Sequence, residues 1–97
     1  LIRSAKGPEW DHGARRREQR GWDEHAEFMD ALVDDGFVVL GGPIGEGDGE
    51  DTLLIAEAAD EDEVRSRLAG DPWAETILTI KAVEPWQVWL GELSPAA

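Results

Sequence analysis

Residues 37–59 read FVVLGGPIGEGDGEDTLLIAEAA, and this stretch decides the fold because it holds two apolar runs separated by a glycine-rich break. Residues 37–40 form a continuous apolar run that is typical of a buried strand, which we expect to end at Gly41, Gly42 and Pro43. Residues 45–51 contain three glycines and four acidic residues, which predicts a loop. Residues 52–59 predict a second strand, so two consecutive strands lie at the centre of the chain.

A helix is predicted on each side of these two strands. Residues 22–33 carry apolar side chains at helical spacing together with His25, and Gly36 supplies the residue that ends this helix. After the second strand, Asp60 and Glu63 have the spacing of a capping box, and Gly70 closes the second helix.

Strands are also predicted near both ends of the chain. Residues 1–5 predict a first strand, and the polar, arginine-rich stretch from there to Gly21 predicts a long loop. Residues 76–83 predict a fourth strand, and residues 86–90 have the length and composition of a last short strand. The order is β-α-β-β-α-β with an extra short C-terminal strand, which is the ferredoxin-like pattern of the α+β class. At this length we expect a single domain over residues 1–97.

The predicted sheet has apolar residues on both faces. Leu53 and Ile55 alternate with Leu54 and Ala56, so this strand is apolar on each side. Two helices can cover one face of a four-stranded sheet, and 97 residues leave nothing to cover the other. An exposed apolar face promotes association, so we infer a homodimer whose sheets pack face to face.

The composition excludes several classes of partner and chemistry. The chain has nine Lys and Arg against 22 Asp and Glu, and this net charge of −13 repels a phosphate backbone, so we expect no nucleic-acid partner. The longest apolar runs are too short to span a membrane, so we expect no membrane partner. The absence of cysteine excludes thiolate chemistry and, with no signal-peptide pattern, favours the cytoplasm.

His25 is the first candidate for chemistry because it lies on the apolar stripe of the first predicted helix. A buried imidazole needs a hydrogen-bond partner, and one interpretation is a core histidine bound to a main-chain carbonyl. The other interpretation is a general acid or base, since histidine in general exchanges protons near neutral pH.

Asp71 also has two interpretations. An Asp before a Pro commonly starts a short helical turn, with the carboxylate as N-cap and Pro72 at the first helical position. Alternatively, the carboxylate accepts the Nδ1 proton of His25, fixes its tautomer and stabilises the imidazolium. Only the fold can bring the two residues within hydrogen-bond reach, which is about 2.6 to 3.2 Å.

The remaining polar residues form weaker patterns. No serine or threonine lies in the sequence context of a nucleophile elbow, and neither histidine has metal-ligand spacing, so we expect no metal and no cofactor. Arg15, Arg16 and Arg17 could bind an anionic group of a substrate or remain a solvated loop. Gly42 could let a substrate approach the backbone, and most of the tryptophans are expected to anchor the core or an interface.

Several of these features together resemble the YCII (YciI-like) family. They are the helix from His25, the strand ending in Gly41, Gly42 and Pro43, the acid-capped second helix, Asp71-Pro72-Trp73, and Pro85-Trp86. The resemblance covers nearly the whole chain and implies a dimeric α+β barrel, in which two ferredoxin-like sheets pack face to face. In this family a histidine and an aspartate in a pocket are proposed to be catalytic, and these positions match His25 and Asp71.

The resemblance also implies a class of reaction. Related dimeric α+β barrels include muconolactone isomerases, and dehydrochlorination of a chlorinated hydroxylated aromatic compound is associated with YCII members. We therefore expect a small enzyme that moves protons on a small cyclic or aromatic organic acid, by isomerisation or by elimination of HX. Its expected substrate-binding residues are Gly42, Pro43, Trp73, Arg15, Arg16 and Arg17. A non-catalytic small-molecule sensor with the same pocket and a structural dimerisation module are the alternatives.

Overall fold

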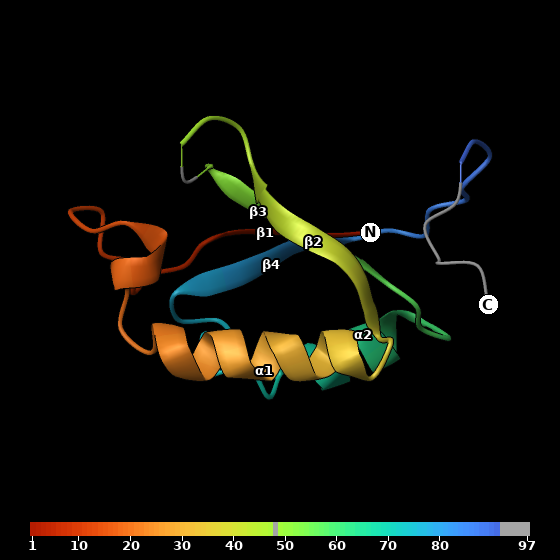
Figure 1. The fold of residues 1–97 in the computed structure, drawn as a ribbon, viewed down its shortest axis with the longest axis horizontal. Helices are drawn as coiled ribbons and strands as arrows, with labels where there is room; N and C mark the ends of the chain where they lie inside the picture. Colours follow the sequence, from red (N-terminus) through yellow and green to blue (C-terminus); the bar gives the residue numbers. More distant parts are fainter. Residues whose placement is uncertain (48, 92–97) are drawn as a thin grey trace.

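The computed structural model describes residues 1–47 and 49–91 and contains a four-stranded sheet with two helices on one face (Figure 1). All neighbouring strands are antiparallel, and their order is β2-β3-β1-β4. This is the predicted ferredoxin-like α+β fold. The elements in chain order are β1 (Ile2–Lys6), the 3₁₀ helix η1 (Arg16–Glu18), α1 (Trp22–Asp34), β2 (Val38–Ile44), β3 (Asp51–Ala56), α2 (Glu61–Leu68) and β4 (Leu78–Val83).

Helix α1 lies between two glycines whose backbone angles other residues rarely adopt. Gly21 at the N-cap has a φ of 76°, and Gly36 after the last turn has a φ of 78°. Both angles lie in the left-handed region, where glycine has no side chain to clash with the backbone. Between them, Phe28, Met29 and Leu32 pack into the core against the sheet. The helix therefore has defined ends and one face fixed toward the sheet, as the periodicity predicts.

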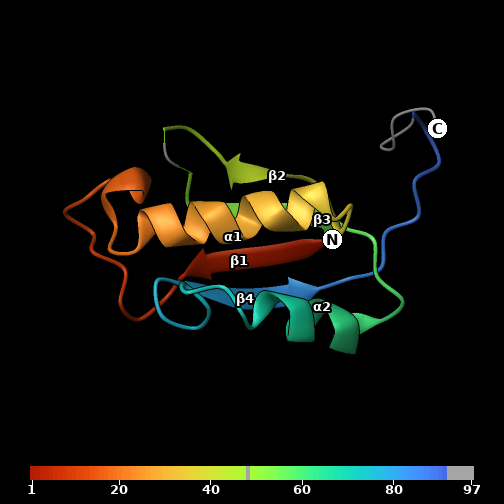
Figure 2. The ribbon, with the colours of Figure 1, turned by 60° about the horizontal axis from the view of Figure 1, so that its bottom comes forward.

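Helix α2 begins at the predicted aspartate cap. The backbone of Asp60 is extended, and its carboxylate accepts a hydrogen bond from the N–H of Glu63 at 2.8 Å. Val64 and Leu68 are buried in the same core cluster as Leu32 of α1. Both helices therefore cover the same face of the sheet, and Figure 2 shows them lying along it on one side.

Strand β2 is longer than predicted. It continues through the Gly-Gly-Pro sequence at which we expected it to end, with Gly41 opposite Leu54 and Pro43 opposite Thr52 of β3. β2 is an edge strand, where a proline without an N–H group can be accommodated. A Cβ on Gly41 would clash with the end of the Leu54 side chain, which would have to shift to make room for it.

The predicted short strand over residues 86–90 is absent. β4 ends at Val83, and Glu84 then joins the start of the chain, because its N–H donates to the carbonyl of Leu1 at 2.8 Å. The amino group of Leu1 donates in return to the carbonyl of Glu84 at 2.7 Å. The described residues beyond this point have no regular secondary structure, and Trp89 is 86% exposed. A strand needs a neighbouring strand for its backbone hydrogen bonds, and the described chain supplies none to this segment.

The sheet face opposite the helices carries no helix or strand within residues 1–47 and 49–91. Strand alternation directs Leu53 and Ile55 to this face, and both line a shallow groove on it. The same face also carries charge, since the carboxylate of Asp51 forms ion pairs with Arg3 at 3.0 Å and with Lys81 at 3.7 Å. The uncovered face is therefore apolar in one part and holds a charged cluster in another.

Candidate functional site

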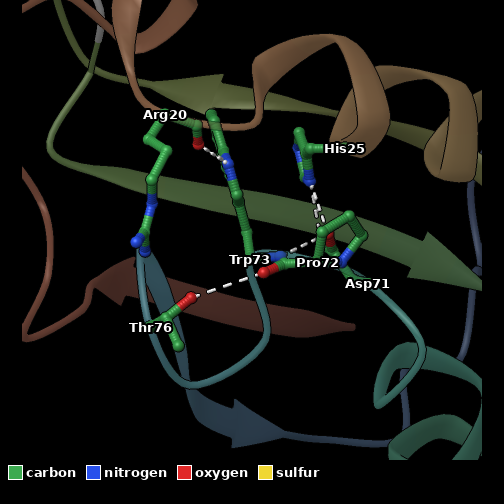
Figure 3. Close-up of polar contacts among 6 residues, drawn as sticks. All are labelled: Arg20, His25, Asp71, Pro72, Trp73 and Thr76. Carbon is green, nitrogen blue, oxygen red and sulfur yellow. Dashed lines mark hydrogen bonds and ion pairs between the residues drawn. The ribbon is translucent and has the colours of Figure 1, made fainter.

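His25 lies at the first turn of α1, and its imidazole faces the turn that follows α2 (Figure 3). Its Nδ1 is 2.8 Å from Oδ1 and 2.9 Å from Oδ2 of Asp71. The two side chains are only 12% and 10% exposed, so the contact is largely shielded from water. The predicted contact between these distant residues is therefore present, and their catalytic role stays a prediction.

Asp71 serves the turn and the histidine at the same time. Its N–H donates to the carbonyl of Leu68 at 3.1 Å, at the end of α2, and its Oδ1 accepts the N–H of Trp73 at 2.9 Å. The Asp71 carboxylate therefore caps the turn and contacts His25, as the two interpretations of its sequence position predict. Because a carboxylate accepts hydrogen bonds, this contact places the proton of a neutral His25 on Nδ1 and leaves the lone pair on Nε2.

The indole of Trp73 lies flat against the imidazole of His25. The two ring centroids are 4.0 Å apart and the ring planes differ by 8°. Trp73 is 1% exposed, and its Nε1 donates to the carbonyl of Arg20 at 2.6 Å, which joins the turn after α2 to the loop before α1 (Figure 3). A Cβ on the next residue, Gly21, would lie 3.4 Å from that Nε1. The carboxylate therefore fixes the imidazole at its edge, and the indole fixes it across one face.

A cavity of about 630 Å³ lies beside this pair, bounded by α1, α2 and the helix-facing side of the sheet. Its volume falls in the range of small-molecule sites, about 300 to 1,000 Å³. His25 and Asp71 both line it, and most of the remaining wall is apolar. The other polar and charged residues at its wall include Ser4, Arg16, Asp30, Thr52, Arg65 and Glu75.

Half of the predicted substrate-binding residues line this cavity. Gly42, Pro43 and Arg16 are among its lining residues, so the second half of β2 and the arginine-rich segment both reach it. A Cβ on Gly42 would meet nothing within 4 Å, but Gly42 lies opposite Leu53, so this open position is on the uncovered face of the sheet. The predicted approach of a substrate to this glycine stays a prediction.

The other three predicted substrate-binding residues lie elsewhere. Trp73 is buried behind His25 and contributes no wall to the cavity, so its contact is with the imidazole. Arg15 is also outside the cavity, and the guanidinium of Arg17 lies over the ring of Trp22 at 5.8 Å from its centroid. The three consecutive arginines therefore point to different surroundings, which their sequence could not show.

The arginine-rich segment is folded around one buried side chain. Gln19 is 4% exposed, and its Nε2 donates to the carbonyls of Asp11 at 2.8 Å and Ala14 at 3.1 Å, while its Oε1 accepts the N–H of Asp11 at 2.9 Å. These bonds hold η1 in place, and Arg16 in that helix lies over the ring of Trp10 at 5.3 Å. The expected long loop thus has internal order. The sequence does not distinguish Gln19 from its exposed polar neighbours, so its role was missed.

Ser4 and Thr52 are cavity residues that the sequence analysis considered only as nucleophiles. They lie directly opposite one another in β1 and β3, and both line the cavity. Ile2 belongs to the core under the helices, and strand alternation puts Ser4 on the same face. That alternation was readable in the sequence, whereas the pairing with Thr52 depends on the strand order.

Two features are absent from residues 1–47 and 49–91. No group of three or more His, Asp or Glu side chains is placed to hold a metal ion there. No helix in this part of the chain is both long enough and apolar enough to cross a membrane.

The fold and the site define a small α+β domain in which a histidine and an aspartate from two different helix ends meet beside a partly open cavity. The model of the YCII-related domain matches residues 7–87, and the chain belongs to this family. No curated protein and no solved structure matches it.

Proposed function

We propose that the protein is an enzyme that transfers protons on a small cyclic or aromatic organic acid. The observation that carries this proposal is the contact of His25 Nδ1 with the Asp71 carboxylate at 2.8 Å, at the wall of a cavity of small-molecule size. A histidine whose one nitrogen is held by a carboxylate can act as general base through the other. No hydrogen bond from the described residues reaches Nε2, so this nitrogen is available to a ligand.

In the proposed reaction, Nε2 takes a proton from a carbon atom of the substrate that lies next to a carbonyl group. The electron pair of the broken C–H bond forms a new C=C bond, and negative charge moves to the carbonyl oxygen. In an isomerisation, the imidazolium returns the proton to a different atom. In an elimination, the charge on oxygen re-forms the carbonyl group and the C=C electrons form a new double bond to the neighbouring carbon atom, from which a halide leaves with its bonding electrons. The imidazolium then passes its proton to water. The Asp71 carboxylate stabilises the imidazolium in both cases.

The cavity supports a substrate that is mostly apolar and carries one anionic group. Its wall is largely apolar, and two cationic side chains, Arg16 and Arg65, also reach it. Arg65 is paired with Glu61 at 2.8 Å, and Arg16 lies over Trp10. A carboxylate or enolate that reaches either cation would gain charge-assisted hydrogen bonds. This combination favours a small ring with an acidic substituent.

We also propose that two copies associate through the uncovered sheet face. Leu53 and Ile55 line the groove on that face, and no helix of the described chain shields them. Packing a second sheet against them would remove this apolar surface from water. In this arrangement the charged cluster of Arg3, Asp51 and Lys81 would lie in or near the interface and would favour one register.

The enzyme proposal is tested by a turnover screen with matched histidine variants. Unsaturated lactones and chlorinated hydroxyaromatic acids are incubated with the wild type, His25→Ala and His12→Ala, and products are followed by absorbance and by halide release. His12 is the only other histidine of the chain and is exposed. We expect turnover by the wild type and His12→Ala and none by a folded His25→Ala. Binding of these compounds without turnover by the wild type would favour the sensor alternative instead.

A further inference from the structure

A row of directly opposed residues crosses all four strands on the floor of the cavity. Pro43 in β2 lies opposite Thr52 in β3, Thr52 opposite Ser4 in β1, and Ser4 opposite Ile80 in β4. All four line the cavity. The two central members of the row carry hydroxyl groups, and the two outer ones are apolar. The floor is therefore polar at one place, where the two middle strands meet.

Both hydroxyl-bearing residues of this row are shielded from water. Ser4 is 8% exposed, and Oγ1 of Thr52 is fully buried without a hydrogen-bond partner among the described residues. Leaving a buried hydroxyl unpaired costs free energy, so most such groups in native proteins have a partner. In a packed strand a valine of the same shape would avoid this cost. The Thr52 hydroxyl therefore lacks a partner in this conformation, and a rotation of the side chain about χ1 would turn it into the cavity, where a ligand oxygen could pair with it.

We propose that Ser4 and Thr52 form an oxygen-binding subsite that takes a hydroxyl, carbonyl or enolate oxygen of the ligand. Cross-strand partners have Cβ atoms about 4.5 to 5.5 Å apart, so two hydroxyls can reach one oxygen atom. Each hydroxyl can donate one hydrogen bond and also accept one, so the pair suits either a neutral or an anionic oxygen.

This subsite specifies the substrate class of the proposed enzyme, on which it rests. His25 is on the helix wall of the cavity and the hydroxyl pair is on its sheet floor. A ring compound bound between them has its oxygen at the floor and a C–H bond available to Nε2. The charge that develops on that oxygen when the proton leaves is then stabilised by the two hydroxyl donors. The ligand is thus a small ring that bears a hydroxyl or carbonyl group.

The test compares two probes of similar size, phenol and toluene, in which a hydroxyl group takes the place of a methyl group, and their binding to the full chain is followed by NMR titration. Thr52→Val removes the hydroxyl and keeps the shape, whereas Thr52→Ser keeps the hydroxyl. Thr76→Val is the matched control, since Thr76 does not line the cavity. We expect Thr52→Val to weaken phenol binding roughly three- to tenfold, the range of one net hydrogen bond, and to leave toluene binding undiminished. Thr52→Ser and Thr76→Val retain the affinity of the wild type for phenol.

Thermal unfolding gives an independent readout. Because Thr52→Val replaces an unpaired buried hydroxyl by a methyl group, we expect the Tm to rise rather than fall. Unchanged phenol binding in Thr52→Val, equal weakening of phenol and toluene, or no phenol binding by the wild type at millimolar concentration would each overturn the subsite. If Thr52→Val does not fold, Ser4→Ala is held to the same criteria.

The result of this binding test can be distinguished from the result of the turnover test of the proposed function. Loss of phenol affinity in Thr52→Val together with an inactive wild type would retain the subsite and reject the enzyme. Unchanged phenol affinity together with turnover that depends on His25 would reject the subsite and retain the enzyme.

Discussion

The imidazole of His25 is held by side chains that follow the other helix of the fold. Asp71 contacts its Nδ1 at 2.8 Å, and Trp73 stacks on its face at 4.0 Å. The same short turn supplies both, because Asp71 Oδ1 accepts the N–H of Trp73. One three-residue turn therefore determines the orientation of the proposed base. A substitution in this turn can keep it folded and still change the catalytic rate.

Asp71→Asn should impair the reaction while leaving the turn folded. Asparagine caps turns about as well as aspartate, so it can still accept the N–H of Trp73. A neutral amide does not stabilise the imidazolium, and we expect kcat to fall by on the order of 10²-fold or more with little change in KM. Steady-state kinetics on the wild type and the variant measure this split. A variant with wild-type kcat would contradict the role of the carboxylate.

At the residue scale, the sequence predicted the contact between His25 and Asp71 but not the roles of Trp73 and Gln19. The apolar stripe drew attention to His25, and the family resemblance paired it with Asp71. The stacking of Trp73 depends on how the loop before α1 packs on the turn after α2, and Gln19 is buried by hydrogen bonds to residues more than three positions away in that loop. Such contacts between segments have no local pattern, so periodicity and capping rules could not reveal them.

At the scale of elements, α1 places the histidine through the geometry of its first turn. The N–H of His25 donates to the carbonyl of Gly21 at 2.9 Å, and Gly21 itself lies against the indole of Trp73. Gly36 at the other end of the helix has a similar left-handed φ but no neighbour within 4 Å of the position of its Cβ. Both ends of α1 therefore require a left-handed backbone φ, and only the end at Gly21 lies beside the site.

Gly21→Ala and Gly36→Ala should have similar effects on stability and different effects on activity. Each places a Cβ at a left-handed φ, which costs about 1 to 2 kcal/mol of unfolding free energy. Only Gly21→Ala also adds an atom next to the Trp73 indole, so we expect it alone to lower kcat. Urea unfolding and kinetics on both variants check this comparison. Equal kcat values in the two variants would show that the start of α1 does not position the base.

Helices and central strands were predictable, whereas strand ends were not. Glycine and aspartate caps and helical spacing give α1 and α2 within about one residue. β2 continues through Gly-Gly-Pro because an edge strand tolerates proline, and the segment over residues 86–90 forms no strand because no neighbour is present for it. The predicted strands over residues 52–59 and 76–83 are observed as Asp51–Ala56 and Leu78–Val83. Where a strand ends depends on which strand lies next to it, and this order cannot be read from the composition of a segment.

At the scale of the whole molecule, the two faces of the sheet differ, because the helices cover only one of them. The helices cover the face that holds the cavity, and the opposite face carries the half-buried Leu53 and Ile55 beside the charged cluster around Asp51. The sequence predicted that both faces are apolar, and the cluster is an addition that the alternation of Arg3 with Ile2 could have indicated. The proposed homodimer follows from the uncovered face.

Leu53→Lys should convert the proposed dimer to a monomer. A lysine at the centre of an apolar interface would bring a charge out of water, and two copies would repel one another. Ala31→Lys is the matched control, because Ala31 is exposed on α1. Light scattering at micromolar concentration should give about twice 10.7 kDa for the wild type and Ala31→Lys, and 10.7 kDa for a folded Leu53→Lys. A monomeric wild type at this concentration would contradict the proposal.

The central claim is that Nε2 of His25 exchanges a proton with a carbon atom of a ligand in the cavity, and hydrogen–deuterium exchange measures this step without product formation. The probe is 3-oxocyclohexanecarboxylate, a small ring acid with acidic C–H bonds and no leaving group, followed by proton NMR in D₂O. We predict that the wild type and His12→Ala exchange the protons beside the carbonyl faster than buffer does, and that folded His25→Ala matches buffer. Exchange by His25→Ala at the wild-type rate, or a wild type no faster than buffer, would contradict the claim.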